Sequence, residues 1–395
     1  MTTYLIMTVG TGTAGKDSNL AAGLRRTVDL LQPEKFWLVP STDEVSQLTA
    51  DLVREGLPSF QPWSAQTAYR AISRPDSLED CRQTVREVIQ KVRSVAPRNV
   101  HLVVNPTSGT KQMSVGAALA ALDEGLGELV FTVGERADGV VKTGTETLET
   151  FDASSYFAER DLETVRSLAH AGALAAAARI AGRHESLTPA AEVAQCLHEW
   201  ERQNYAEARR IAAQSSAAAL VPVRHALEQL AKAAQAAEPQ PQVISDLLHT
   251  ADLLHRRRDF EATLVLACRA LEMGLRHALH EKTGLHEPYS LPKLCALPVS
   301  QDIKERSRTV SHDGQRTILN LNTIAKILQQ LGHDLGNGFF QDRELQALIR
   351  VRNDLMHQLR AVKEAESQGA LHRVNHLLAA LHLPAAAARP SLAFL

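Results

Sequence analysis

The sequence has 395 residues, which is enough for two or three domains. Its formal net charge of −2 argues against a generally basic nucleic-acid-binding protein, so any nucleic-acid site must be local. Aromatic residues make up only 4% of the chain, which argues against broad base-stacking surfaces. The four cysteines form no C-x-x-C pair, as expected in a reducing compartment. Because no apolar run reaches about 18 residues, we expect a cytoplasmic protein without a membrane span.

The first 155 residues alternate between strand and helix patterns. Apolar, β-branched runs predict buried strands at 4–9, 36–40, 101–104 and 128–133, and residues 145–151 predict an alternating edge strand. Helices are expected at 19–31, 78–95 and 114–122, and residues 45–75 are expected to be helical and then irregular. This order is typical of an α/β domain with a doubly wound sheet.

A glycine-rich turn follows the first predicted strand. The stretch Gly10-Thr11-Gly12-Thr13-Ala14-Gly15-Lys16 fits both the G-x-G-x-x-G dinucleotide fingerprint and the G-x-x-x-x-G-K phosphate loop. Asp17 stands where the phosphate loop needs Ser or Thr for magnesium, which argues against ATP hydrolysis. A site for NAD would need an acidic residue at the end of the second strand, and Asp43 comes slightly late for that role.

A second turn, Asn105-Pro106-Thr107-Ser108-Gly109-Thr110-Lys111, lies between the strand at 101–104 and the helix at 114–122. Such a turn offers backbone N–H groups, the positive end of a helix and the charge of Lys111 to an anion. The alternative is a polar strand–helix loop that binds nothing. Since both turns follow parallel strands, we expect them at the ligand-binding edge of the sheet.

After Ser155 nearly all of the sequence has helical character. We expect a helical connector up to about residue 238, with Pro239-Gln240-Pro241 as a second boundary. Beyond that boundary, helices are predicted at 242–255, 260–282, 318–331, 343–364 and 372–383, with a looser segment at 284–316.

The helix from Arg343 carries Arg350-Val351-Arg352-Asn353-Asp354-Leu355-Met356-His357. A histidine can transfer protons near neutral pH, and an arginine offers a fixed fork to a phosphate oxygen. Together these groups suit cleavage of RNA by its own 2′-OH. An ordinary solvated helix face is the other interpretation of this stretch.

The combination of the two parts resembles the CRISPR-associated CARF–HEPN family of type III systems. The two turns resemble those of CARF domains, which sense cyclic oligoadenylates. Arg352-Asn353 followed by His357 resembles the HEPN ribonuclease motif, although Arg350 also fits the spacing. The resemblance implies three parts: a Rossmann-like CARF domain at 1–155, an all-α connector at 156–238 and an all-α HEPN domain at 239–395.

The resemblance also implies how the protein works. It implies an endoribonuclease that needs no metal or other cofactor, cuts single-stranded RNA and is activated allosterically by a cyclic oligoadenylate. It implies a homodimer, in which both copies of the HEPN motif line one cleft. The implied catalytic residues are Arg352, Asn353 and His357, and the implied ligand-binding residues are Gly10, Thr11, Gly12, Thr13, Asn105, Thr107, Ser108, Gly109, Thr110 and Lys111.

Two other functions stay open. In one, the CARF pocket itself cleaves the cyclic activator, so that the domain is a ring nuclease. In the other, the protein is a non-catalytic nucleotide sensor whose HEPN domain only mediates contacts. The ring size of the activator and the base preference toward RNA do not follow from the sequence.

Overall fold

The structure is a computed structural model that describes residues 2–11, 17–57, 70–97, 99–137, 140–142, 144–311, 314–357 and 360–390. It consists of two compact units, Met1–Arg160 and Asp161–Leu395. The division falls within helix α5 (Ser154–His170). Across the described ranges, no helix is both long enough and apolar enough to cross a membrane.

A five-stranded sheet with the order β2-β1-β3-β4-β7 forms the centre of the first unit. Its first four strands in the chain are parallel, and β7 pairs antiparallel with β4 at the edge. The strands are β1 (Thr3–Val9), β2 (Lys35–Pro40), β3 (His101–Asn105), β4 (Glu128–Val133) and β7 (Thr147–Asp152), with a separate ribbon of β5 (Arg136–Ala137) and β6 (Val140–Val141). The predicted α/β fold with an edge strand near 145–151 is confirmed.

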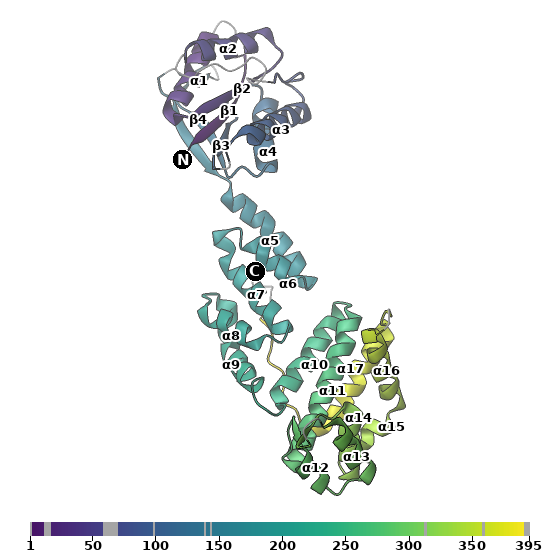
Figure 1. Ribbon diagram of the computed structural model, residues 1–395. Coiled ribbons are helices and arrows are strands. Elements are labelled where there is room, and N and C mark those ends of the chain that lie inside the picture. The colour runs from purple at the N-terminus through teal and green to yellow at the C-terminus, as the bar shows by residue number, and fades with distance from the viewer. Residues whose placement is uncertain are drawn as a thin grey trace. The chain divides into compact units, whose positions relative to one another are not determined.

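Helices cover both faces of this sheet (Figure 1). Helices α1 (Asp17–Leu31) and α2 (Glu44–Glu55) lie on one face, and α3 (Leu78–Val95) and α4 (Lys111–Asp123) lie on the other. Strand β1 shows why both faces are covered, because it is apolar on both sides. Leu5 and Met7 pack with α1 and α2, while Tyr4 and Ile6 pack with α3 and α4. A strand buried on both faces needs a continuous apolar run rather than an alternating one.

The strand order reverses between β1 and β3. From β1 the chain moves outward to β2, and it then returns past β1 to form β3 on the other side. In open parallel sheets such a reversal leaves a crevice at the carboxyl ends of the two strands. The turns at 10–11 and 106–110 begin at these strand ends, so the topology places both candidate turns at one crevice.

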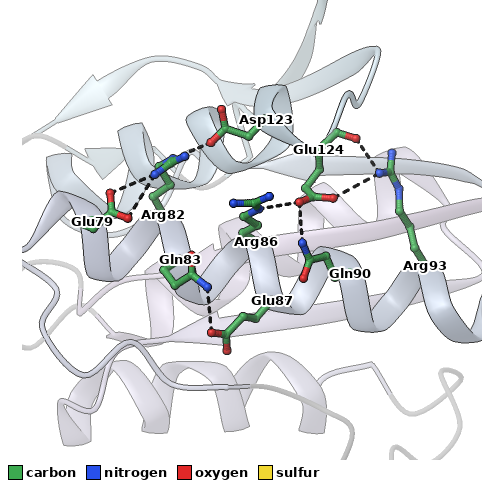
Figure 2. Close-up of polar contacts among 9 residues, drawn as sticks. All are labelled: Glu79, Arg82, Gln83, Arg86, Glu87, Gln90, Arg93, Asp123 and Glu124. Atoms are coloured by element: carbon green, nitrogen blue, oxygen red, sulfur yellow. Dashed lines mark hydrogen bonds and ion pairs between the residues drawn. The ribbon is translucent and has the colours of Figure 1, made fainter. Parts of the chain in front are cut away.

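Helices α3 and α4 are joined by close packing and by a polar network. A Cβ atom at Gly116 would lie 2.7 Å from Cys81 Cβ, so glycine is what allows the two helices to approach. Figure 2 shows Arg86 Nε donating to Glu124 Oε1 at 2.7 Å, while Arg93 Nη1 donates to the Glu124 carbonyl at 2.6 Å. Burial raises the pKa of Glu124, but the hydrogen bonds and positive charges around it bring the pKa below its ordinary value. The network therefore fixes the C-terminal end of α4.

The second unit is nearly all helical. Its helices are the rest of α5, α6 (Leu174–Ala181), α7 (Thr188–Glu201), α8 (Tyr205–Gln214), α9 (Arg224–Ala233), α10 (Pro241–Arg256), α11 (Phe260–Thr283), α12 (Leu291–Ala296), α13 (Gln301–Val310), α14 (Leu321–Gln330), α15 (Asp334–Gln341), α16 (Arg343–His357) and α17 (Glu364–Leu378). Short 3₁₀ turns lie at Glu185–Leu187, Ala218–Val223 and Ala379–Leu381, and β8 (Tyr289–Ser290) pairs with β9 (Arg316–Thr317).

The buried apolar residues of this unit form one continuous cluster, which runs from Val165 in α5 to Leu378 in α17. The helices expected at 242–255 and 260–282 are confirmed by α10 and α11. The segment at 284–316 contains two helices, α12 and α13, which the sequence did not predict. The division of this unit into a connector and a HEPN domain stays a prediction.

The helix predicted at 343–364 is wrong in its C-terminal end. Helix α16 ends at His357, and α17 begins at Glu364. Between them the Val362 amide donates to Glu261 Oε1 on α11 at 3.1 Å, and the Lys363 amide donates to Glu366 Oε2 at 3.0 Å. These tertiary and capping contacts fix the non-helical backbone just before α17.

Candidate ligand pocket and ribonuclease site

A cavity of about 550 Å³ opens at the carboxyl ends of β1 and β3. Six of the predicted ligand residues line it, namely Gly10, Thr11, Thr107, Ser108, Gly109 and Thr110. Asn105 and Lys111 do not belong to the lining as far as the chain is described, and Gly12 and Thr13 lie outside the described residues. The two turns therefore meet at one cavity whose volume suits a nucleotide-sized ligand.

The two turns are in direct backbone contact. Gly10 N donates to Ser108 Oγ at 3.0 Å, and Thr8 Oγ1 donates to the Ser108 carbonyl. A Cβ atom at Gly10 would lie 2.6 Å from Gly109 Cα, so no larger residue fits between the turns. Gly109 also has φ +115°, a backbone conformation that favours glycine. The Gly10 N–H is thus used inside the protein and is not presented to a ligand.

Asn105 holds the second turn in place through its side-chain hydrogen bonds. It is 1% exposed, and its Nδ2 donates to Thr132 Oγ1 at 2.8 Å. Its Oδ1 accepts from the Thr107 amide at 2.9 Å, while Thr107 Oγ1 accepts from the Thr132 amide at 2.8 Å. Thr132 Oγ1 also shares a hydrogen bond with Thr27 Oγ1 on α1 at 2.8 Å. Asn105 therefore acts through its neighbours, and Thr107 and Thr132 form part of the cavity wall.

Thr110 begins α4 at the rim of the cavity. Its Oγ1 accepts from the Met113 amide at 3.2 Å, which is the usual role of a threonine in front of a helix. The same hydroxyl donates to the Pro75 carbonyl at 2.6 Å and so holds the segment before α3 against the turn. Lys111 is the first residue of α4, and its side chain is exposed.

Several cavity residues were not predicted from the sequence. Ser41 follows β2, Thr132 lies on β4, and Glu146 precedes β7, while Asp43, which the sequence suggested only for an NAD site, also lines the cavity. The position of Ser41 directly after a parallel strand was a usable signal, since such strand ends form the crevice. No signal pointed to Glu146, because it falls within the edge strand predicted at 145–151, yet the residue is only 5% exposed.

In the second unit, α16 carries the predicted ribonuclease residues. Leu345, Leu348 and Val351 are buried, which fixes the face of the helix that packs on the core. The structure brings Arg352 and Asn353 together, with Arg352 Nη1 donating to Asn353 Oδ1 at 3.1 Å.

Arg352 is half-buried at the edge of this packed face. Its Nε atom is buried and has no hydrogen-bond partner among the residues described. Burial raises the pKa of the Cys268 thiol on α11 to about 11, and the positive charge of Arg352 opposes that rise. The guanidinium group is therefore near enough to α11 to influence the Cys268 thiol. Arg350, the alternative arginine, is exposed.

His357 lies at the C-terminal end of α16 and is exposed, as is Asn353. Five positions on a helix separate two side chains by about 140° around the axis and by about 7.5 Å along it. Arg352 and His357 of one chain therefore point in different directions from α16. One chain alone therefore does not bring the arginine and the histidine to the same point.

Comparison with known proteins places these two sites in a known architecture. Residues 232–380, which include α16, match the family model described as the Csm6 HEPN domain. Among solved structures, the chain is similar to Enterococcus italicus Csm6 bound to cyclic hexa-2′-fluoro-hexa-dAMP, with a TM-score of 0.65 and 13% sequence identity over 96% of this chain and 94% of that chain. The family match covers the HEPN region, and the structural similarity shows a common fold over nearly the whole chain, so both support a Csm6-like CARF–HEPN relationship. No curated protein matches the sequence.

The two sites lie in different units of the chain. The cavity at β1 and β3 lies in the first unit, which is called the CARF domain below after the resemblance of its turns, and Arg352 and His357 lie in the region that matches the HEPN model. The match of residues 232–380 to the Csm6 HEPN domain supports a CRISPR ancillary ribonuclease. The predicted combination of a Rossmann-like domain with a helical HEPN region is confirmed.

Proposed function

We propose that this chain is an endoribonuclease that cuts single-stranded RNA in the cytoplasm when a cyclic oligoadenylate binds its CARF domain. The observation that carries the proposal is the arrangement on α16 of the HEPN region, where a half-buried Arg352 is followed by an exposed His357. Neighbouring residues also support it, because Asn353 Oδ1 accepts from Arg352 and so orients the guanidinium group.

The chemistry is cleavage of RNA by its own 2′-OH and needs no metal ion. One histidine takes the proton of the 2′-OH, the oxygen attacks the adjacent phosphorus, and a second acid protonates the leaving 5′ oxygen. Arg352 stabilises the negative charge that develops on the phosphorane oxygens. Each chain offers a single Arg352 and a single His357 at this place, so one chain provides too few groups for both proton transfers.

A homodimer would supply the second histidine and the second arginine. Because Arg352 and His357 diverge by about 140° around α16, one copy does not direct both side chains at the same phosphate. Two copies related by a two-fold axis would contribute two histidines and two arginines to one composite cleft. The dimer would likewise pair two CARF cavities and give a symmetric pocket for a cyclic ligand.

The ligand assignment rests on the CARF cavity. The cavity lies at the reversal of strand order, where parallel sheets bind ligands, and it combines hydroxyl groups with the N-terminal end of α4. The structurally similar Enterococcus italicus Csm6 was solved with a cyclic hexanucleotide. We propose that the ring acts as an allosteric activator of the HEPN cleft, with Arg352 rather than Arg350 as the catalytic arginine.

The test is RNA cleavage by the full chain in EDTA, with and without rings of three, four and six adenylates. We expect one ring to trigger cleavage, and His357→Ala to lower it by at least about 100-fold, since acid–base catalysis contributes on that scale. His376→Ala is the matched control, because His376 is exposed on α17 and lies outside the motif.

Two results would contradict this proposal. Normal cleavage by folded His357→Ala protein would remove the histidine from the mechanism. Loss of cleavage in EDTA that returns with added magnesium would remove the metal-free chemistry.

A further inference from the structure

Glu146 is a buried carboxylate at the wall of the CARF cavity. The residue is 5% exposed and lies in the segment between β6 and β7. Its Oε2 accepts from the Gly144 amide at 2.6 Å. Its other oxygen, Oε1, is buried and has no hydrogen-bond partner among the residues described.

The unpartnered oxygen lies beside α1. A Cβ atom at Gly23 would be 3.3 Å from Glu146 Oε1, so a glycine at this position lets the carboxylate approach the helix closely. Gly23 and Glu146 both line the cavity. Leaving a buried carboxylate oxygen without a donor is costly, and such groups in folded proteins usually have a functional explanation. A donor on a bound ligand would satisfy it.

The chemistry of a carboxylate narrows the choice of that donor. A phosphate group carries only acceptor oxygens and negative charge, so Glu146 repels it. The exocyclic amine of adenine is a donor, whereas guanine and hypoxanthine present a carbonyl oxygen at the same ring position. The lining also includes Leu20, Leu24 and Met113, whose apolar side chains suit the faces of a purine ring.

We infer that Glu146 Oε1 accepts a hydrogen bond from the exocyclic amine of an adenine base of the bound ring. Glu146 thereby selects adenine against purines that carry an oxygen at this position. The inference rests on the proposed function and adds to it the residue that reads the base.

The first test uses the wild-type protein and needs no variant. We compare the binding of the activating cyclic adenylate with that of the same ring made from inosine, in which a carbonyl replaces each amine. A hydrogen bond to a charged group accounts for about a 10- to 100-fold difference in affinity. We therefore expect the inosine ring to bind at least about 10-fold more weakly.

The second test is Glu146→Gln. The Gly144 amide still needs an acceptor, so the glutamine oxygen should replace Oε2 and turn the amide NH₂ group toward the cavity. The variant then offers a donor where the wild type offers an acceptor. We expect about 10-fold weaker binding of the adenylate ring and tighter binding of the inosine ring than in the wild type. Glu149→Gln is the matched control, because Glu149 is an exposed carboxylate on β7.

The outcomes separate this inference from the function on which it rests. If the adenylate ring triggers RNA cleavage but the inosine ring binds equally well, the assignment of Glu146 is wrong and the sensing function stands. If Glu146→Gln weakens both rings equally, the carboxylate contacts a shared group such as a ribose hydroxyl, and base reading is wrong. If no adenylate ring binds the wild-type protein, the sensing function and this inference both fail.

Discussion

The substitution Asn105→Ala tests how the second turn of the CARF domain is held in place. Asn105 is buried at the end of β3, and it both donates to Thr132 Oγ1 and accepts from the Thr107 amide. Alanine keeps the backbone and removes both hydrogen bonds. It also leaves the Thr107 N–H without the acceptor that fixes the turn.

The expected loss follows from these two bonds. Each hydrogen bond contributes about 1 kcal/mol of net stability, and a donor left without a partner adds a further penalty. We therefore expect Asn105→Ala to lower the free energy of unfolding of the CARF domain by about 2–4 kcal/mol. Since domains are stable by roughly 5–15 kcal/mol, the variant should fold but open more often.

Hydrogen exchange measured by mass spectrometry at increasing urea concentrations localises the effect to one unit. Peptides from β1 and β3 should exchange faster in Asn105→Ala, whereas peptides from α11 should be unchanged. Asn99→Ala is the control, because Asn99 is exposed in the same unit and its truncation should change stability by less than about 0.5 kcal/mol. Equal protection of β3 in Asn105→Ala and Asn99→Ala would refute the reasoning.

Two further predictions concern the HEPN-containing unit. Asp246 is 1% exposed and accepts from Arg389 at 2.7 Å and from Trp200 Nε1 at 3.0 Å. Asp246→Ala should lower the free energy of unfolding by roughly 3–5 kcal/mol, because Arg389 is left as an uncompensated charge. A urea unfolding curve that matches the wild type would contradict this prediction. Burial, together with the charge of Arg389, lowers the pKa of His249 in the folded protein below its value in the unfolded chain. As the pH falls below about 6.5, the unfolded state therefore binds more protons than the folded state. The free energy of unfolding should therefore decrease from pH 7 to pH 5, and the decrease should be smaller in His249→Gln. Urea midpoints that are identical in the wild type and in His249→Gln across this range would exclude His249 as the cause.

The sheet of the CARF domain could be predicted because its signals are local. Continuous apolar runs such as Leu5-Ile6-Met7 identify strands buried on both faces, and turns that follow parallel strands identify the ligand edge. The strand order is not local, yet the reversal between β1 and β3 brought both predicted turns to one cavity.

The parts that could not be predicted depend on contacts between distant residues. The non-helical backbone at 360–363 is held by Glu261, which lies 101 positions before Val362 and accepts from its amide. The burial of Glu146 depends on the approach of α1 at Gly23. Asn105 was expected to bind the ligand, whereas its hydrogen bonds show that it is committed to Thr107 and Thr132.

The contact between Gly10 and Gly109 has a consequence for anyone who would build a new sensor from this domain. A Cβ atom at Gly10 would lie 2.7 Å from Gly109 N, so the second turn occupies the space that a side chain on the first would need. The cavity therefore cannot be transplanted one loop at a time. A graft must carry both strand ends together, on neighbouring parallel strands about 4.8 Å apart, or the two glycines will not meet.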